Sequence, residues 1–209
     1  MMSSTKATSN IQSDQGNMSK PRILAFAGSI RGESFNARLV RVAAEGARTS
    51  GADVTILDLA DYPLPLFDQD FEQQQGTPEN ATKLKQQFLD HDGLLISSPE
   101  YNSSITPLLK NTIDWVSRSA SGEEPLAAYR HKVAAIMAAS PGGLGGLRGL
   151  VHVRSILSSI GVIVLPDQVA VPRAFEAFDD DGQIKDEKRR AQVQGLGQSL
   201  ATTLSKLAG

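Results

Sequence analysis

Five short apolar runs alternate along the chain with segments of helical spacing. The apolar runs cover residues 23–27, 54–59, 93–98, 132–139 and 162–165. Short, nearly continuous apolar runs are typical of parallel strands whose two faces are both covered by helices. The pattern therefore predicts five buried strands in a parallel sheet.

Apolar residues three and four positions apart mark the predicted helices. The helices are expected at residues 38–48, 79–90, 107–116, 150–160 and 185–207. Residues 63–78, which follow the second strand, carry prolines, glutamines and a glycine and are predicted to form a long loop. Loops longer than about 12–15 residues are uncommon and are often functional.

The alternation of strands and helices implies a parallel sheet with right-handed crossovers. We predict an α/β fold of the flavodoxin-like kind, a doubly wound five-stranded parallel sheet with helices on both faces. Ligands of such folds bind at the carboxyl ends of the strands, here between the first and the third. Residues 21–209 are expected to form this domain, and residues 1–20, rich in Ser, Thr, Asn and Gln, are expected to form a disordered tail.

Composition and charge narrow the chemistry. The 209 residues have a net charge of −2 and contain no cysteine. The weak net charge argues against nucleic acid or membrane partners, and the missing cysteines exclude disulfides, iron–sulfur clusters and thiolate zinc sites. The histidines His91, His131 and His152 lack the spacing of metal ligands, so no metal site is expected. No apolar run reaches the ~18 residues of a membrane helix, and residues 1–20 lack the apolar core of a secretory signal. The cysteine-free composition fits a reducing cytoplasm, which is the expected location.

The turn after the first strand, residues 28–36, is rich in groups that bind phosphate. It opens a helix, and a helix N-terminus offers free backbone N–H groups and the positive end of the helix dipole. Ser29 and Ser34 add hydroxyl groups, Asn36 adds an amide, and Arg31 adds a guanidinium fork. The alternative is that Ser34 is only a helix cap and Arg31 only a surface charge. Because the dinucleotide pattern G-x-G-x-x-G and the Walker pattern G-x-x-x-x-G-K-[ST] are both absent, a terminal monophosphate such as that of FMN is indicated.

Two further loops have the chemistry that a flat heteroaromatic ring requires. The loop after the third strand, residues 99–104, supplies the aromatic face of Tyr101 and the amide of Asn102. The loop after the fourth strand, residues 140–146, contains four glycines in its last five residues. Those glycines indicate either a ligand that approaches the backbone closely or ordinary turn chemistry. Tyr101 taken alone is equally compatible with burial at a strand end.

The three loops together resemble those of the NADPH-dependent FMN reductase family, which includes bacterial quinone, chromate and azo-dye reductases. The motif G-S-x-R-x-x-S-x-N stands at residues 28–36, and S-x-G-x-x-G-G-x-R stands at residues 140–148. Between them, residues 99–115 begin with P-E-Y-N and end with L-K-N-x-I-D-W. The middle motif is long and specific, and the resemblance runs from Arg22 to the last helix.

The resemblance implies FMN as cofactor and assigns the residues that hold it. The phosphate would be bound by Ser29, Arg31, Ser34 and Asn36. The isoalloxazine ring would be contacted, largely through backbone groups, by Pro99, Glu100, Tyr101 and Asn102. The ring and the ribityl chain would be lined by Ser140 and Gly142.

The implied activity is an NAD(P)H oxidoreductase. Hydride would pass from NADPH or NADH to FMN and then to a small acceptor such as a quinone, azo compound, chromate, ferric chelate or free flavin. The flavin carries this chemistry, so no catalytic side chain is expected. The family also implies a homodimer or homotetramer, and Trp115 could lie either at that interface or in the core.

Two other functions remain open at this point. The first is a flavodoxin-type electron carrier without NAD(P)H reductase activity, although such carriers are usually very acidic and lack an arginine like Arg31 in the phosphate loop. The second is a flavin-free, redox-sensing interaction protein.

Overall fold

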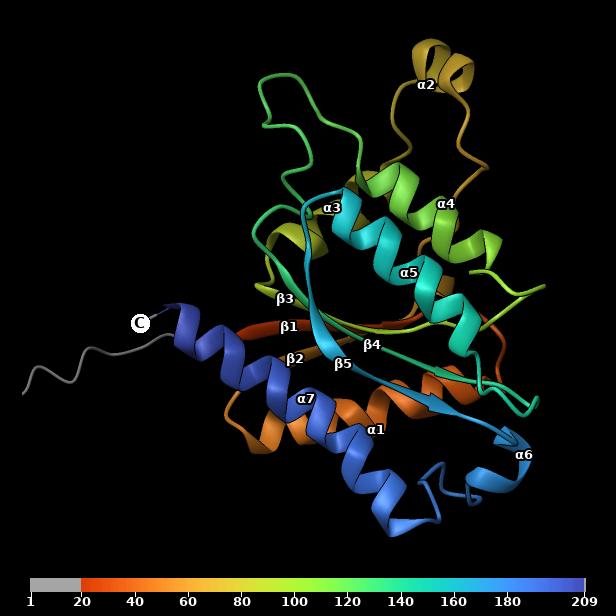
Figure 1. The fold of residues 1–209 in the computed structure, drawn as a ribbon. Coiled ribbons are helices and arrows are strands. Elements are labelled where there is room, and N and C mark those ends of the chain that lie inside the picture. The colour runs from red at the N-terminus through yellow and green to blue at the C-terminus, as the bar shows by residue number, and fades with distance from the viewer. Residues whose placement is uncertain (1–19, 209) are drawn as a thin grey trace, which may run out of the picture.

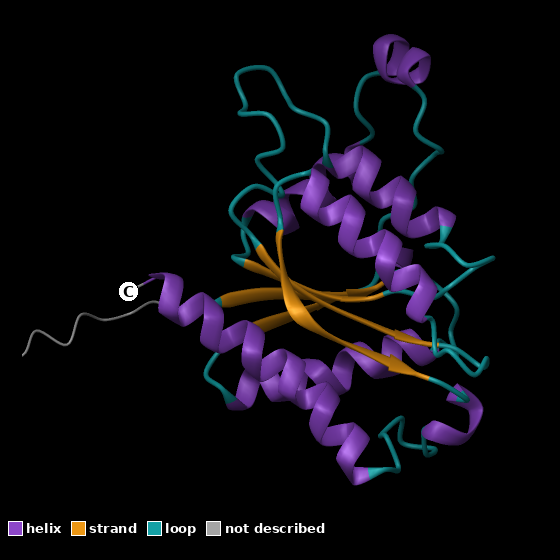
Figure 2. Ribbon diagram, in the orientation of Figure 1, coloured by secondary structure: helices purple, strands orange, loops and turns teal. Residues whose placement is uncertain are grey.

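A computed structural model of the protein describes residues 20–208, so the predicted disordered tail lies almost entirely outside the described residues. Its sheet contains five strands, all parallel, in the order β2-β1-β3-β4-β5 (Figures 1 and 2). The strands are β1 (Arg22–Ala27), β2 (Asp53–Leu57), β3 (Gly93–Ser97), β4 (Val133–Ala139) and β5 (Ile163–Val171). This order confirms the predicted flavodoxin-like topology, in which the strand order reverses between β1 and β3.

Helices cover both faces of the sheet (Figure 1). They are α1 (Phe35–Thr49), α2 (Gln69–Gln75), α3 (Glu79–Leu89), α4 (Pro107–Val116), α5 (Leu147–Ser159), α6 (Ala174–Ala177) and α7 (Glu187–Ala208), with a 3-10 turn at Leu59–Asp61. Helices α1 and α7 pack on one face, and α3, α4 and α5 pack on the other. No helix in residues 20–208 has both the length and the apolar character that crossing a membrane requires.

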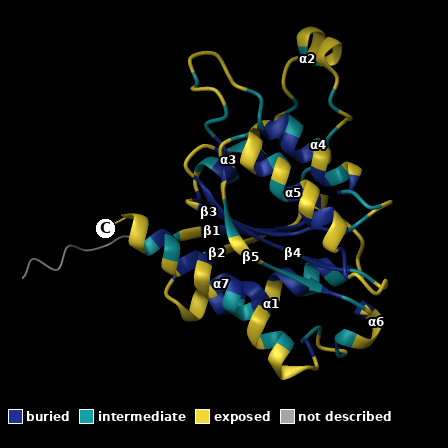
Figure 3. Cartoon of the chain, viewed as in Figure 1, coloured by how far each residue is buried: buried dark blue, intermediate teal, exposed yellow. Residues whose placement is uncertain are grey.

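Two buried apolar layers hold the helices to the sheet (Figure 3). Alternate residues of a strand point to opposite faces, so in β1 Ile23 packs toward α1 and α7 while Leu24 packs toward α3 and α4. Helices α1 and α7 lie so close that a Cβ atom on Gly46 would come 2.0 Å from the carbonyl oxygen of Gln194. Glycine is therefore required where α1 crosses α7.

The fifth strand is longer than predicted. The apolar run ends at Leu165, yet β5 continues through Pro166 to Val171. An edge strand pairs on one side only, so it tolerates proline and polar residues that an inner strand excludes. The guanidinium of Arg154 donates hydrogen bonds to the carbonyl groups of Val164, Leu165 and Pro166 along this strand.

The predicted loop at residues 63–78 contains a short helix, α2, which projects from the body of the protein (Figure 1). Its N-cap is Asp68, and none of its residues is buried, so apolar periodicity gave no signal for it. The segment before it is anchored by Trp115, which is 1% exposed and donates a hydrogen bond from Nε1 to Pro65 O at 2.8 Å. The ring of Phe67 meets the Trp115 ring edge-on. Of the two positions considered for Trp115, the structure shows the buried one.

Candidate functional site

One buried side chain joins the three loops that the sequence singled out. Asn36, in the first turn of α1, is 4% exposed. Its Oδ1 accepts hydrogen bonds from Ser97 Oγ at 2.8 Å and from Ala139 N at 2.9 Å, and its Nδ2 donates to Ala139 O at 2.9 Å. Ser97 ends β3 and Ala139 ends β4. Loops 28–34, 99–104 and 140–146 therefore meet on one edge of the sheet, which we call the carboxyl rim.

The position of Asn36 differs from the expectation that its amide donates to a phosphate. Both ends of the amide bind protein groups, and the side chain is buried. A buried amide with three protein partners fixes the positions of those partners, because breaking any of the bonds leaves a polar group unpaired. The structure thus shows Asn36 bracing the rim.

A second buried side chain at the rim, Thr106, was missed by the sequence analysis. Thr106 caps α4 by accepting a hydrogen bond from Leu109 N at 3.1 Å, and its hydroxyl donates to Gly28 O at 2.8 Å. Gly28 N in turn donates to Ser97 O at 2.9 Å. A threonine directly before Pro107 is a recognisable cap signal, but its bond to Gly28 depends on tertiary structure.

The loop before α1 presents backbone donors that have no partner within residues 20–208. Ser34 is the N-cap, and its hydroxyl accepts a hydrogen bond from Ala37 N at 3.3 Å. Among the hydrogen bonds between described residues, none uses the backbone N–H of Ser29, Ile30, Gly32 or Glu33. Free N–H groups at a helix N-terminus have the chemistry that a phosphate group requires.

The two charged side chains of this loop, Arg31 and Glu33, differ in their surroundings. Arg31 is exposed, and its guanidinium makes no hydrogen bond or ion pair with any residue in 20–208. Glu33, whose carboxylate would repel a phosphate, forms an ion pair with Arg38 instead. The loop therefore offers one free positive charge, while its negative charge is balanced by a neighbour.

Loop 99–104 is a tight turn with unusual backbone angles. Tyr101 and Ser104 exchange two backbone hydrogen bonds of 3.0 Å each. The two residues between them, Asn102 (φ 51°) and Ser103 (φ 67°), adopt the left-handed conformation that favours glycine. Tyr101 is 50% exposed, so its ring is available at the rim.

The Glu100 side chain turns away from the rim toward α5. Its carboxylate accepts hydrogen bonds from Arg148 Nε at 2.9 Å, Arg148 Nη2 at 2.6 Å and Gly149 N at 3.0 Å. Burial alone would raise the pKa of Glu100, but the hydrogen bonds from Gly149 and Arg148 outweigh it and hold that pKa below its ordinary value. The Glu100 carboxylate is thus occupied by α5, while its backbone stays part of loop 99–104.

Two of the four glycines in loop 140–146 are required by close contacts with neighbouring residues, and the other two make no such close contacts. A Cβ atom on Gly145 would come 2.7 Å from Pro172 N, and one on Gly146 would come 2.7 Å from Ala138 Cβ. Gly143 has no neighbouring atom within 4 Å of a Cβ position. Ser140 Oγ accepts a hydrogen bond from Gly142 N at 3.3 Å. The loop thus combines glycines that the turn requires with backbone that a ligand can approach.

Helix α6 extends the rim and gave no advance signal in the sequence. Ala174 N donates to Ser140 O at 3.1 Å, which places the start of α6 directly on loop 140–146. Phe175 is 73% exposed, and its ring meets the ring of Phe35, the first residue of α1, edge-on. A large exposed aromatic side chain at a rim of free donors provides a surface for another flat ring.

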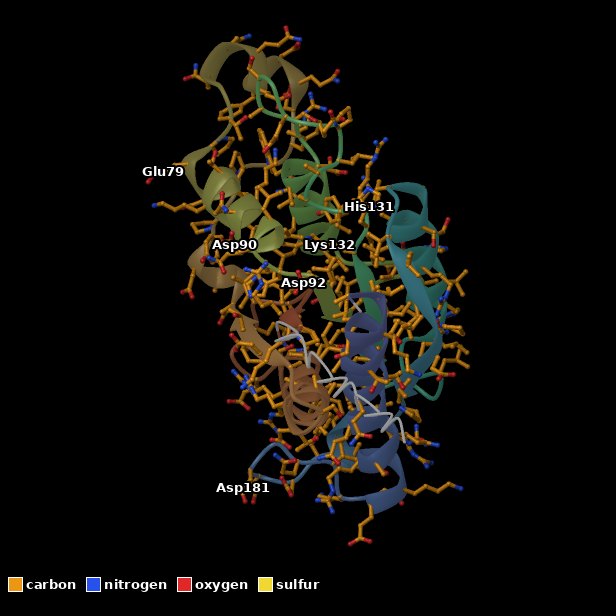
Figure 4. The ribbon with its side chains drawn as sticks, turned by 90° about the vertical axis from the view of Figure 1, so that its left-hand side faces the viewer. Glu79, Asp90, Asp92, His131, Lys132 and Asp181 are labelled. Atoms are coloured by element: carbon orange, nitrogen blue, oxygen red, sulfur yellow. The ribbon has the colours of Figure 1, made fainter. Side chains whose placement is uncertain are left out.

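The opposite end of the sheet, where Asp92 and Lys132 lie, faces the viewer in Figure 4. We call it the amino edge and define it by Arg22, His91, Asp92 and Lys132, which lie where β1, β3 and β4 begin. Lys132 is buried, and its Nζ donates to His91 O. His91 Nδ1 donates to Gln87 O at 2.6 Å, and its Nε2 lies 2.8 Å from Thr55 Oγ1. Nowhere in residues 20–208 do three or more His, Asp or Glu side chains gather as a metal site.

The sequence profile that describes the NADPH-dependent FMN reductases matches residues 21–176, which is most of the chain. The chain belongs to this family. An NAD(P)H-dependent FMN reductase of Pseudomonas aeruginosa is 33% identical over 189 residues, which cover 90% of this chain and 97% of the relative. A quinone reductase of Escherichia coli is 36% identical over 146 residues, which cover 70% of this chain and 74% of the relative.

Solved structures agree with this membership of the FMN reductase family. The flavoenzyme NAD(P)H:(acceptor) oxidoreductase FerB of Paracoccus denitrificans is 26% identical and superimposes with a TM-score of 0.74, covering 89% of this chain and 98% of that one. An archaeal flavodoxin superimposes with a TM-score of 0.59 at 10% identity, which shows a common fold alone. This FMN reductase homologue is thus an enzyme, a flavoprotein with FMN as cofactor and NAD(P)H as reductant, as the sequence motifs predicted.

Proposed function

We propose that the protein transfers hydride from NADPH or NADH to FMN bound on the carboxyl rim, and from there to a small quinone. The observation that carries this proposal is the junction made by Asn36, which brings three loops with complementary chemistry to one edge. One loop offers free N–H groups and a guanidinium, and the other two offer approachable backbone beside an exposed aromatic ring. Quinone is the preferred acceptor because several relatives carry it in their names.

Each loop then has a defined part in holding FMN. The phosphate is bound by Arg31, by the hydroxyl groups of Ser29 and Ser34 and by the free N–H groups before α1. The backbone of residues 99–102, from Pro99 to Asn102, faces the ring, and Ser140 and Gly142 line the ring and ribityl side. Asn36 supports these groups from beneath. FMN supplies the hydride and electron chemistry when it is bound, and the protein supplies position and electrostatics.

The same part of the carboxyl rim serves both substrates. Four exposed apolar side chains belong to the three rim loops and to α6: Ile30, Tyr101, Leu144 and Phe175. Nicotinamide and quinone are both flat rings, and exposed apolar and aromatic side chains favour their stacking. Because the two substrates occupy one place in turn, we expect ping-pong kinetics.

The deciding experiment is anaerobic mixing of the purified FMN-loaded protein with NADPH and, separately, with NADH. Rapid loss of the yellow colour, followed by its return when a benzoquinone is added, supports the proposal. A flavin that stays oxidised with both nicotinamides favours an electron carrier, and a protein that takes up no FMN favours a flavin-free role. A panel with azo dyes, chromate, ferric chelates and free flavin then ranks the acceptors.

We also propose that the protein acts as a homodimer or homotetramer in the cytoplasm, where NAD(P)H is supplied. Leu147 and Val151 lie one turn apart on α5, and both are exposed, as is the nearby Leu144. An exposed apolar stripe of this kind is typical of a protein interface. Light scattering measures the assembly, and Val151→Glu is expected to reduce its size. A monomeric wild-type protein would contradict the proposal, and fractionation of the source cells tests the location.

A further inference from the structure

The turn at residues 99–104 needs support from outside itself. Asn102 and Ser103 both adopt the left-handed backbone conformation although neither is glycine. Such residues cost about 1–3 kcal/mol each and persist only where the surrounding structure holds them. The two hydrogen bonds between Tyr101 and Ser104 lie within the turn, so they do not fix its position relative to the rest of the rim.

Helix α5 supplies that support at both ends of the turn. At the first end, the Glu100 carboxylate binds Arg148 and the N–H of Gly149 through three hydrogen bonds. At the second end, Ser104 Oγ lies 2.8 Å from His152 Nδ1. A Cβ atom on Gly149 would lie 3.3 Å from Ser104 O and 3.4 Å from Glu100 Cβ, which shows how closely α5 packs against the turn.

The two partners of the ion pair at the first end, Glu100 and Arg148, differ in their exposure to solvent. The Glu100 side chain is only 8% exposed, whereas the Arg148 side chain is more than half exposed. A buried carboxylate that loses its partner keeps a charge that water cannot screen well, and this costs more than losing an exposed charge. Glu100 directly precedes Tyr101, so this carboxylate is carried by the turn that is assigned to the flavin ring.

We propose that Glu100 and Arg148 are positioning residues, which hold the turn at residues 99–104 with its left-handed backbone at Asn102 and Ser103 and balance each other's charge next to the flavin site. This inference rests on the proposed FMN site. Reduction adds negative charge to the flavin, so the pair affects reduction as well as binding. An unpaired Arg148 favours the reduced flavin, and an unpaired Glu100 disfavours it. Loss of either partner also frees the turn and weakens FMN binding.

The experiment compares Glu100→Gln, Arg148→Met and the double variant as FMN-loaded proteins. The measurements are the midpoint potential of bound FMN and the FMN dissociation constant. We expect Glu100→Gln to raise the potential, Arg148→Met to lower it, and the double variant to return close to wild type. Each single variant is expected to weaken FMN binding about tenfold, because a charged hydrogen bond contributes ~1.5–3 kcal/mol and Arg148 is screened by water.

Two controls separate positioning from general damage. Arg118→Met breaks the ion pair between Arg118 and Glu72, which lies away from the rim on the projecting segment, and should change neither the potential nor FMN binding. Arg148→Lys keeps the charge but loses the two-pronged contact, so it should keep a potential near wild type while weakening FMN binding.

Three outcomes overturn the inference: shifts of the same sign in both single variants, no shift in either, or a double variant that shifts further than both. Thermal unfolding of each FMN-free protein shows whether a variant folds. If Glu100→Gln does not fold, the comparison of Arg148→Lys with Arg148→Met still tests the inference. A failure of the proposed function can be distinguished from these outcomes, because NAD(P)H would then not reduce the flavin of the wild-type protein.

Discussion

The two edges of the sheet are built from the same buried strands, yet they differ in whether their polar groups have protein hydrogen-bond partners. At the amino edge, Lys132 donates to His91 O, Arg22 N donates to Asp92 Oδ2 at 2.8 Å, and both ring nitrogens of His91 have protein partners. At the carboxyl rim, the backbone N–H groups of Ser29, Ile30, Gly32 and Glu33 have no partner among the described residues, and neither does the Arg31 guanidinium.

The difference indicates that one edge of the sheet contributes mainly to stability and the other mainly to ligand binding. Buried polar groups are nearly always paired, so the amino edge contributes to stability. The rim instead combines backbone donors that have no partner in residues 20–208 with exposed aromatic side chains, groups that a ligand can use. We therefore expect substitutions at the rim to affect FMN binding and substitutions at the amino edge to affect folding.

The largest effect is expected from Asn36→Leu, because this one change at the rim should lower both the stability of the fold and the affinity for FMN. The change leaves Ser97 Oγ and both backbone groups of Ala139 without partners in a buried place. Unpaired buried groups cost about 1–3 kcal/mol each, so we expect a loss of ~3–5 kcal/mol in unfolding free energy and FMN binding weakened by more than a hundredfold. Thermal unfolding and flavin fluorescence titration measure the two effects.

Asn111→Leu is the matched control for that variant. Asn111 also binds backbone groups through both ends of its amide, Phe67 N at 2.8 Å and Pro65 O at 2.9 Å, but it lies beneath the projecting segment. It should lower stability and leave FMN binding unchanged. Equal loss of FMN affinity in both variants would contradict the role given to Asn36.

Arg31→Ala should separate the two edges most clearly, since it is expected to weaken FMN binding without changing the stability of the fold. The exposed guanidinium has no partner in the described part of the chain, so its loss should leave the thermal midpoint of the FMN-free protein unchanged. A charged hydrogen bond to phosphate contributes about 1.5–3 kcal/mol, which corresponds to FMN binding weakened roughly 10- to 100-fold. Arg190→Ala on α7 is the control, and an unchanged FMN affinity in Arg31→Ala would remove the phosphate loop from the site.

Lys132→Met tests the other half of the comparison and should give the smallest effect. Removing the ammonium leaves His91 O without its donor, and removing a buried charge partly offsets that loss, so we expect ~1–2 kcal/mol lower stability. FMN affinity and turnover should not change. Any loss of FMN binding in this variant would show that the two edges are coupled.

The pH dependence of the wild-type protein gives a second measure at Lys132. Burial lowers the pKa of Lys132 below its ordinary value, so the unfolded chain binds the proton more tightly than the folded one. Stability should therefore rise with pH through the alkaline range below the ordinary lysine pKa, and Lys132→Met should lack this rise. Thermal midpoints measured across that range, for both proteins, compare the two slopes.

Much of the fold could be predicted because local sequence carries it. Helix α4 begins and ends where the sequence placed it, since Pro107 follows a threonine cap at its start. Helices α1 and α5 each begin three residues earlier than predicted, at Phe35 and Leu147, because the buried residues among their first three positions are Asn36 and Gly149, which add nothing to an apolar period. The same reasoning explains the missed α2 and α6, which have almost no buried face.

What the sequence by itself determined was the alternation of five strands with helices, the loops that follow strands one, three and four, and the family those loops belong to. These depend on residues close together in the chain. Only the tertiary structure decided that Asn36 bonds Ser97 and Ala139, and that Glu100 turns to Arg148. Hydrogen bonds across 48 to 103 residues leave no trace in local spacing, because the partners become neighbours only when the sheet and its helices pack.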